Sequence, residues 1–136
     1  MKQYQVVAAV VCKDGRYLCM QKGRTRYDYT SYKWEFPGGK IEALETPQEA
    51  LAREMMEELD FPVEIGRNLV TVSHEYPDFR ITMAAYMCSP CAERFTMKEH
   101  IAYRWCSKEE ISLLDWAAAD VDIVKAIVSS VDHMKP

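Results

Sequence analysis

Apolar residues in the first third of the chain fall into short runs that predict β-strands. Residues 4–12 and 16–21 are apolar and β-branched, and Lys13-Asp14-Gly15 separates them. Asp-Gly between two such runs predicts a β-hairpin, because both residues tolerate positive φ. Residues 34–36 predict a short extended segment, which Pro37-Gly38-Gly39 is predicted to break.

The clearest helix signal follows this break. Thr46 can cap an N-terminus, Pro47 suits the first helical position, and Glu49 completes a Thr-x-x-Glu capping box. The helix is predicted to run from Pro47 to Leu59 and to end before Phe61-Pro62. Its apolar stripe is predicted to consist of Leu51, Ala52, Met55, Met56 and Leu59.

The rest of the chain adds further strands and helices. Runs that predict strands are residues 63–74, 80–88 and 101–106. A second capping box at residues 107–110 predicts a short helix, and residues 120–131 carry apolar side chains at a helical period. The order β-β-(β)-α-β-β-β-α-α predicts a mixed sheet with helices packed on it, an α+β or α/β sandwich.

Length and composition restrict the class of protein. The 136 residues fit one domain and contain no linker or repeat, so residues 1–136 are predicted to form a single domain. With 49% hydrophobic and 28% charged residues, the composition is that of a soluble globular protein. The longest apolar run, residues 6–12, is too short to cross a bilayer, and no signal-peptide cleavage pattern precedes it.

Cysteine usage favours a reducing compartment. The five cysteines are odd in number and scattered through apolar segments, which suits free thiols in a cytosol and argues against a disulfide scaffold. Cys88-x-x-Cys91 is a lone pair without the four ligands of a structural zinc site, so strand-end thiols are the favoured interpretation. We therefore expect a cytoplasmic protein with no membrane partner.

Charge is distributed unevenly, although the net charge is only −4 and does not indicate a nucleic-acid polymer as partner. Residues 13–40 hold seven bases against three acids, and residues 42–60 hold seven acids against one base. A basic segment beside an acidic one could hold a polyanion and cations together. The alternative is two solvated faces that pair with each other.

Three carboxylates gather on one face of the predicted helix. Glu54, Glu57 and Glu58 stand at i, i+3 and i+4, within one turn, where they repel one another. Only Arg53 is placed to offset them locally. Convergent oxygen ligands suit Mg²⁺ or Mn²⁺, whereas the alternative is an acidic solvated helix face.

The spacing of glycine, acidic and basic residues from Gly39 to Phe61 resembles the Nudix box. The segment reads Gly39-Lys-Ile-Glu-Ala-Leu-Glu45, then seven residues, then Arg53-Glu-Met-Met-Glu-Glu-Leu-Asp-Phe61. Asp60 and Leu44 stand where the family commonly has glycine. Residues 34–40, Trp-Glu-Phe-Pro-Gly-Gly-Lys, and less specifically residues 114–120, are similar to the branch of MutT-like and cytidine-triphosphate pyrophosphohydrolases.

This resemblance implies a Nudix fold, an α/β/α sandwich around a mixed β-sheet, and a set of functional residues. It implies that the Gly39 carbonyl, Glu54, Glu57 and Glu58 bind a divalent metal, and that Glu54 is the general base. The residue in approximate register with a further acidic ligand of relatives is Glu99; the alternative is an exposed loop glutamate.

Arg53 and Glu45 are expected to act indirectly, if at all, in catalysis. Arg53 is predicted to orient Glu45 or one of the ligand glutamates rather than to touch substrate. Glu45 itself is favoured as a structural residue.

Substrate-binding candidates come from the basic, aromatic and C-terminal segments. Lys22, Arg24 and Lys40 are candidate phosphate contacts, and a solvated strand end is equally open for Lys22 and Arg24. Aromatic residues that could stack on a base, or simply pack in the core, are Trp34, Tyr76 and Phe79.

Asp120 precedes the last predicted helix, where a simple N-cap is the alternative to contact with the base. The MutT-like branch contacts the base from this position. An ionised Asp accepts hydrogen bonds only, which suits the cytosine amine, whereas a protonated Asp could read oxidised guanine.

Together these features predict a Mg²⁺-dependent (or Mn²⁺-dependent) hydrolase that cleaves a nucleoside triphosphate to the monophosphate and pyrophosphate. Cytosine or oxidised-base nucleotides are favoured, and a role in nucleotide pool sanitation is implied. The open alternatives are a Nudix hydrolase of dinucleoside polyphosphates or nucleotide sugars, and a non-catalytic nucleotide sensor. The chain is expected to act as a monomer or homodimer.

Overall fold

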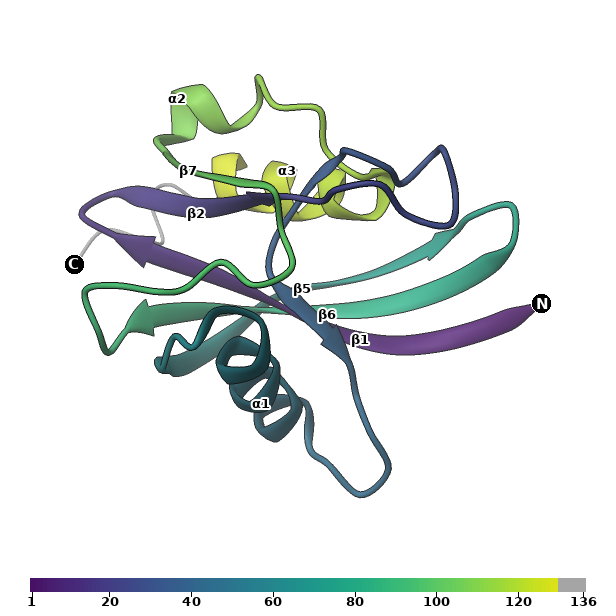
Figure 1. Ribbon diagram of the computed structural model, residues 1–136, viewed down its shortest axis with the longest axis horizontal. Helices are drawn as coiled ribbons and strands as arrows, with labels where there is room; N and C mark the ends of the chain where they lie inside the picture. Colours follow the sequence, from purple (N-terminus) through teal and green to yellow (C-terminus); the bar gives the residue numbers. More distant parts are fainter. Residues whose placement is uncertain (130–136) are drawn as a thin grey trace.

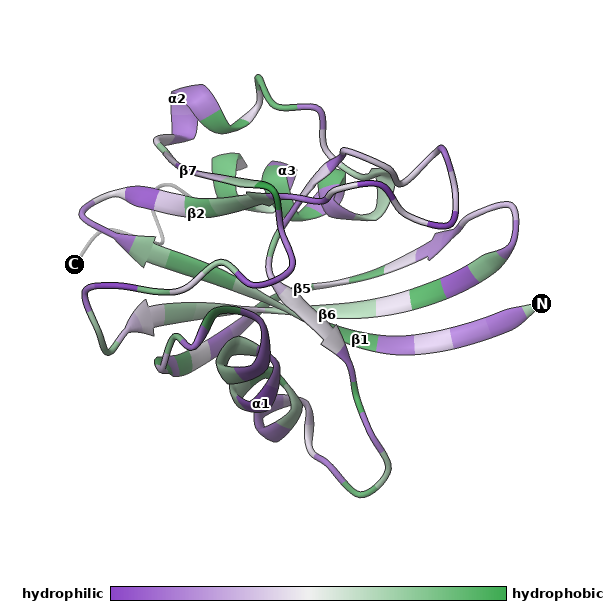
Figure 2. Cartoon of the chain, viewed as in Figure 1, coloured by the Kyte–Doolittle hydropathy of each residue, from purple (hydrophilic) through white to green (hydrophobic). Residues whose placement is uncertain are grey.

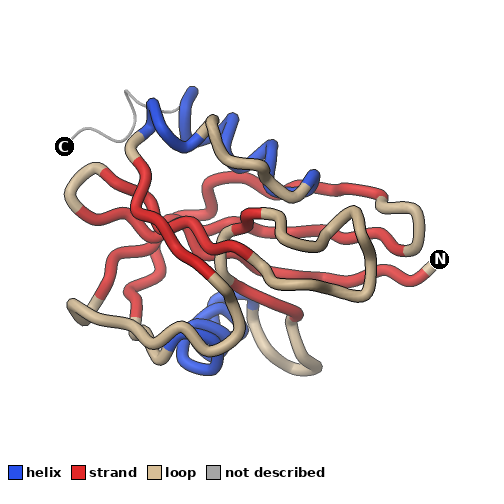
Figure 3. The backbone as a smooth tube through the Cα atoms, turned by 45° about the horizontal axis from the view of Figure 1, so that its top comes forward, coloured by secondary structure: helices blue, strands red, loops and turns tan. Residues whose placement is uncertain are grey.

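A computed structural model describes residues 1–129 and contains one mixed seven-stranded sheet between two layers of helices (Figures 1 and 3). Five strands lie in the order β3-β2-β1-β6-β5, while β4 pairs with β1 and β7 pairs with β2. The bounds are β1 Lys2–Lys13, β2 Arg16–Gln21, β3 Trp34–Glu35, β4 Gly38–Lys40, β5 Val63–Glu75, β6 Phe79–Pro90 and β7 Ala102–Cys106. The predicted α/β sandwich is confirmed.

Strand β1 runs through the centre of the sheet, and both of its faces are buried in its second half. Val7, Ala9 and Val11 pack in the core beneath helix α1 (Pro47–Leu59). Ala8 and Val10 alternate with them and pack in the core beneath helix α3 (Val121–Ser129). The near-continuous apolar run therefore reflects a strand covered by helices on both faces, and its apolar half adjoins β2 (Figure 2).

Helix α1 has the predicted bounds, because its end signals are local. Both hydrogen bonds of the capping box between Thr46 and Glu49 are present. The predicted apolar stripe is partly wrong: Ala52 and Met56 are exposed. The side chains that α1 buries are Ala50, Leu51, Met55 and Leu59.

Asp60, which stands in place of the family's glycine, caps α1 in the left-handed conformation at φ 49°. Its backbone N–H donates to carbonyls of the last turn, the usual role of a C-terminal cap. The departure from glycine therefore changes the residue at the helix end and leaves the helix bounds as predicted.

The sequence predicts that Pro37-Gly38-Gly39 breaks the extended segment, but the structure has a further short strand there. Strand β4 begins at Gly38 and pairs with β1 in antiparallel orientation, with Gly38 opposite Ala8. A Cβ on Gly38 would lie 1.9 Å from the Val7 carbonyl oxygen. Glycine therefore allows β4 to approach β1 closely, and this strand brings Gly39 against α1.

The C-terminal third packs on the other face of the sheet. Helix α2 (Lys108–Ile111) begins at the predicted capping box on Ser107. The predicted helix at 120–131 begins instead as a 3₁₀ turn, η1 (Ala118–Asp120), which continues into α3. Residues 130 and 131 of that prediction lie outside the described residues.

The predicted hairpin between β1 and β2 is confirmed, with Asp14 and Gly15 both at positive φ. All five cysteines carry free thiols; Cys88 is buried near the end of β6, and Cys91 is exposed just beyond it. Within residues 1–129, none of the helices has the length and apolar character needed to span a membrane.

Candidate active site

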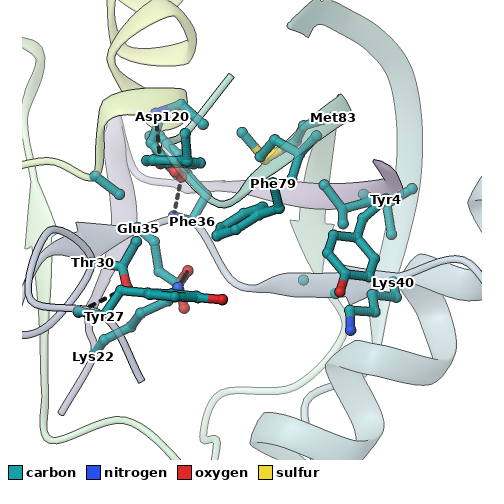
Figure 4. Close-up of a pocket in the computed structure, with 18 of the residues that line it drawn as sticks. Tyr4, Lys22, Tyr27, Thr30, Glu35, Phe36, Lys40, Phe79, Met83 and Asp120 are labelled. Carbon is teal, nitrogen blue, oxygen red and sulfur yellow. Dashed lines mark hydrogen bonds and ion pairs between the residues drawn. The ribbon is translucent and has the colours of Figure 1, made fainter. Parts of the chain in front are cut away.

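A cavity of about 470 Å³ opens between the sheet, the loop at residues 23–33 and η1. Figure 4 shows Asp120 and Phe36 at one end of this cavity, with Lys40 and Tyr4 at the other. The Phe79 ring lies between the two ends. We call this space the main cavity.

A smaller side cavity of about 220 Å³ shares Lys22, Glu35 and Glu58 with the main cavity. Its other lining residues include Arg24, Glu99 and His100. Glu58 of α1 thus lines a space that contains both acidic and basic side chains.

Strand β4 presses its backbone against the glutamates of α1. The backbone N–H of Gly38 donates to Glu58 Oε1 at 3.1 Å. A Cβ on Gly39 would lie only 2.3 Å from Glu54 Oε2, so a side chain there would displace the Glu54 carboxylate. The fold therefore brings the predicted Gly39, Glu54 and Glu58 together.

Arg53 holds several of these carboxylates at once. Its guanidinium donates to Glu45 Oε2 at 2.6 Å and to Glu45 Oε1 at 3.0 Å. Further bonds reach Glu57 Oε2 at 3.0 Å, Glu54 Oε2 at 3.3 Å and the Lys40 carbonyl at 3.0 Å. Arg53 therefore links the helix to the preceding loop, and the bond to Arg53 holds the pKa of Glu45 below its usual range.

Negative charge in the cluster is incompletely compensated. Burial, followed by the charge of Glu35 and a hydrogen bond shared with Glu99, raises the pKa of Glu58 to about 9. Burial also raises the pKa of Glu54, against the opposing effect of Arg53. A carboxyl that is held neutral at pH 7 among other carboxylates marks a place where a cation would be favoured.

The donor set fits a divalent cation in its chemistry and location. Mg²⁺ and Mn²⁺ prefer hard oxygen ligands. The candidates here are the carboxylates of Glu54, Glu57 and Glu58 and the Gly39 carbonyl. Across residues 1–129, no group of three or more acidic, histidine or cysteine side chains is already arranged to hold an ion. Arg53 hydrogen-bonds one carboxylate oxygen of Glu54 and both carboxylate oxygens of Glu57.

Glu35 and His100 are site residues that the sequence analysis did not single out. Glu35 Oε1 lies 3.3 Å from the Lys22 ammonium, and Glu35 Oε2 lies 2.8 Å from Nε2 of buried His100. The Nδ1 atom of His100 is buried and has no hydrogen-bond partner within residues 1–129. Both residues adjoin segments that the sequence did single out, the Trp34 motif and Glu99.

The candidate phosphate contacts divide between the two cavities. Lys22 lines both cavities, Lys40 only the main cavity and Arg24 only the side cavity. The Lys40 ammonium lies 4.1 Å from the centre of the Tyr4 ring. Both lysines stand at the cavity that also contains Gly39 and Glu58, which suits contact with a polyphosphate.

Asp120 is buried in the inner end of the main cavity. Its Oδ2 accepts a hydrogen bond from the Phe36 backbone N–H at 2.9 Å, so the side chain ties η1 to the segment between β3 and β4. Burial, followed by the charge of Glu35, raises the pKa of Asp120 to about 8. The neutral acid therefore predominates at pH 7. Acceptance of a hydrogen bond from the cytosine amine, by contrast, depends on the ionised form.

The aromatic candidates do not share one location. Tyr76 and Phe79 line the main cavity, whereas Trp34 does not and packs against the core beneath α3. Trp34 forms a bridge with Trp116, and its carbonyl accepts from the Ala117 N–H at 2.8 Å. Trp34 therefore packs against the core, the alternative that the sequence left open, and does not line this cavity.

Tyr27 lines the cavity in addition and was not predicted individually. Its ring centre lies 5.7 Å from that of Phe79 and 5.0 Å from that of Tyr29. The aromatic composition of residues 23–33 was the available signal, but only the fold brings this loop to Phe79.

Comparison with known proteins gives concordant matches over nearly the whole chain. The NUDIX domain family matches residues 1–127. A CTP pyrophosphohydrolase of Escherichia coli K12 is 33% identical over 129 residues, 95% of this chain and 94% of that protein. An 8-oxo-dGTP diphosphatase of Proteus vulgaris is 34% identical over 98 residues, 72% of this chain and 87% of that protein.

Solved structures agree with this assignment. The solution structure of the E. coli ORF135 protein is 31% identical, with a TM-score of 0.82, and covers 98% of this chain and 94% of that one. The MutT protein of Methanosarcina mazei Go1 is 23% identical, with a TM-score of 0.84, covers 98% of this chain and 97% of that one, and supports the fold.

Proposed function

This chain belongs to the NUDIX domain family, and on that premise we propose that it hydrolyses nucleoside triphosphates to the monophosphate and pyrophosphate. The observation that carries the proposal is that Gly39, which lines the main cavity, lies close against the Glu54 carboxylate, while the inner end of the same cavity holds Asp120. Acidic residues thus stand near one end of a cavity large enough for a nucleotide, and a hydrogen-bonding residue stands at the other.

We infer that the reaction depends on Mg²⁺ or Mn²⁺. The Gly39 carbonyl, Glu54, Glu57 and Glu58 would hold the ion, and Glu99 is a further candidate because it lines the side cavity together with Glu58. A bound divalent ion lowers the pKa of water and neutralises charge that builds up on phosphate oxygens.

The roles of the chain's own residues follow from their places. Glu54 would hold and deprotonate the attacking water, since its carboxylate lies at the β4 backbone and is partly buried. Arg53 acts as a positioning residue, because it bonds Glu45, Glu54 and Glu57 together. Lys22 and Lys40 would bind phosphate oxygens as charge-assisted donors.

The favoured substrates carry cytosine or an oxidised purine. The relatives named above are a CTP pyrophosphohydrolase and an 8-oxo-dGTP diphosphatase, and both support a nucleotide as substrate. Asp120 can accept from a base amine when ionised and can donate to a base acceptor when protonated. Both states are accessible near neutral pH, since burial raises the pKa of Asp120 to about 8.

The base preference should change with pH. As pH rises through the pKa of Asp120, about 8, the carboxyl loses its proton and becomes an acceptor only. Cytosine should then be preferred over uracil by roughly 10- to 100-fold in kcat/KM, because an acceptor facing the uracil carbonyl loses a hydrogen bond and is repelled. The ratio should be smaller at pH 6.5 than at pH 8.5.

Asp120→Ala tests this preference directly. The variant should flatten the CTP/UTP ratio at both pH values and leave kcat largely unchanged, because the base is remote from the reacting phosphate. An unchanged ratio with a lower melting temperature would mean that Asp120 only ties η1 to Phe36.

A substrate panel tests the proposed function as a whole. The protein is incubated with Mg²⁺ and, separately, with CTP, dCTP, UTP, 8-oxo-dGTP, a dinucleoside polyphosphate or a nucleotide sugar. The products are separated by ion-exchange chromatography. We expect monophosphate and pyrophosphate from cytosine or oxidised-guanine triphosphates. Turnover confined to the dinucleoside polyphosphate or nucleotide sugar, or binding of nucleotides without turnover, would reject the proposal.

A further inference from the structure

The ring of Tyr76 is not free to stack on a base. Tyr29 stacks on it with ring centres 5.5 Å apart, and the Phe79 ring lies 4.9 Å away. His74 approaches with its ring centre at 4.5 Å in an edge orientation. Only 6% of Tyr76 is exposed, so its ring is held by neighbours from the loop and from both ends of the β5–β6 turn.

The hydroxyl of Tyr76 nevertheless reaches the inner end of the main cavity. Its oxygen accepts a hydrogen bond from the Ala119 backbone N–H at 3.0 Å, and Ala119 directly precedes Asp120. Tyr76, Ala119 and Asp120 all line the main cavity. The phenol group and the Asp120 carboxyl therefore stand in the same part of the cavity wall.

The hydroxyl hydrogen of Tyr76 has no acceptor among the hydrogen bonds of residues 1–129, because the bond from Ala119 uses only the oxygen. Burial raises the pKa of Tyr76, so the group keeps its proton at neutral pH. Asp120 is likewise partly committed, since Oδ2 accepts from Phe36. Within the described residues, the Tyr76 hydroxyl hydrogen and the second Asp120 oxygen are thus both available for a hydrogen bond to a ligand.

We propose that the Tyr76 hydroxyl donates a hydrogen bond to an acceptor atom on the nucleobase and so acts as a specificity-determining residue. In cytosine this atom is ring nitrogen N3, which adjoins the amine from which the second oxygen of ionised Asp120 would accept. The proposal rests on the proposed function, since it assigns the base end of the main cavity. It replaces the expectation that Tyr76 stacks on the base.

The physical reason for selectivity is the cost of an unpaired buried donor. A base with an acceptor beside Tyr76 satisfies the hydroxyl, whereas a base without one displaces water and leaves the donor unsatisfied. Sites that hydrogen-bond a substrate group reject analogues that lack the matching atom. Phe79 complements this contact, since its ring lies in the middle of the cavity and can offer a stacking face (Figure 4).

The test pairs a protein deletion with a ligand deletion. We measure kcat/KM for CTP and for 3-deaza-CTP, in which a C–H group replaces N3, on wild type and on Tyr76→Phe. The wild type should prefer CTP by about 10-fold or more, and Tyr76→Phe should reduce this preference to less than about 2-fold.

Tyr29→Phe is the matched control. It removes a hydroxyl that bonds Asp78 at 2.7 Å, from a ring stacked on Tyr76 but outside the cavity lining. This variant should keep the wild-type preference for CTP over 3-deaza-CTP. Melting temperatures of all three proteins report the loss of the Ala119 bond separately, because a purely structural role would lower stability without changing the ratio.

The outcomes distinguish failure of the Tyr76 contact from failure of the proposed function. A CTP/3-deaza-CTP ratio that is the same in wild type and Tyr76→Phe would overturn the role of Tyr76, while CTP turnover would leave the proposed function standing. Turnover of 8-oxo-dGTP without turnover of CTP would overturn only the contact of Tyr76 with cytosine, and turnover of neither nucleotide would overturn both.

Discussion

Removal of divalent metal should abolish nucleotide hydrolysis by this protein. In excess EDTA we expect kcat to fall by at least about 10²-fold, and addition of Mg²⁺ above the chelator concentration should restore it. The reason is electrostatic: Glu54, Glu57 and Glu58 form an acidic cluster, and a triphosphate that approaches it is a polyanion. Pyrophosphate release measured over a series of Mg²⁺ concentrations gives the dependence.

The melting temperature gives an independent measure of Mg²⁺ binding. Mg²⁺ should raise the melting temperature of the wild type, because an ion that binds only the folded state stabilises it. Glu58→Gln should weaken this stabilisation, and Glu64→Gln, a change at an exposed residue on β5, should preserve it. Full turnover in excess chelator would contradict the metal dependence.

Glu54→Gln should lower kcat by roughly 10²-fold or more at saturating Mg²⁺. The substitution removes both a charged ligand and the group assigned to hold and deprotonate the attacking water. It retains the side-chain shape beside Gly39, where the backbone approaches the carboxyl group closely. The fold should persist, because the Glu54 side chain is no part of the core beneath α1.

The comparison variant is again Glu64→Gln, which changes one charge away from the site and should keep wild-type kcat. Circular dichroism and melting temperature establish that both variants are folded. If kcat of Glu54→Gln stays within a few-fold of wild type, Glu54 is neither a required ligand nor the base.

Elements with local signals could be predicted from the sequence to the residue. Helix α1 is the clearest case, since Thr46, Pro47 and Glu49 specify its start and Pro62 limits its end. Strand β4 could not be predicted in this way. Three residues that include two glycines carry no strand preference, and β4 exists because Gly38 and Gly39 can lie close against β1 and α1.

The site shows the same division between local and long-range information. The glutamates of α1 follow from helical spacing, and Arg53 meets Glu57 one turn away, as the period requires. The bond between Glu35 and His100 joins residues 65 positions apart, and Tyr76 reaches Ala119 across 43. Such contacts depend on sheet order, which no local pattern specifies.

For Trp34 the sequence left stacking on a base and packing in the core as alternatives. Its neighbours in the Trp-Glu-Phe segment, Glu35 and Phe36, both line the main cavity, whereas Trp34 itself packs against the core beneath α3. Strand alternation does not decide this, because adjacent Glu35 and Phe36 line the same cavity where β3 ends at Glu35, and only the fold shows which residues meet the cavity.

Isotope labelling shows which phosphorus the water attacks and thereby tests hydrolysis to the monophosphate and pyrophosphate. CTP is hydrolysed by wild type with Mg²⁺ in ¹⁸O-labelled water, and the products are analysed by mass spectrometry. Attack at the β-phosphorus, which the resemblance to the MutT-like branch implies, predicts one ¹⁸O atom in pyrophosphate and none in CMP. Label in CMP, or release of CDP and inorganic phosphate in place of these products, would contradict the account.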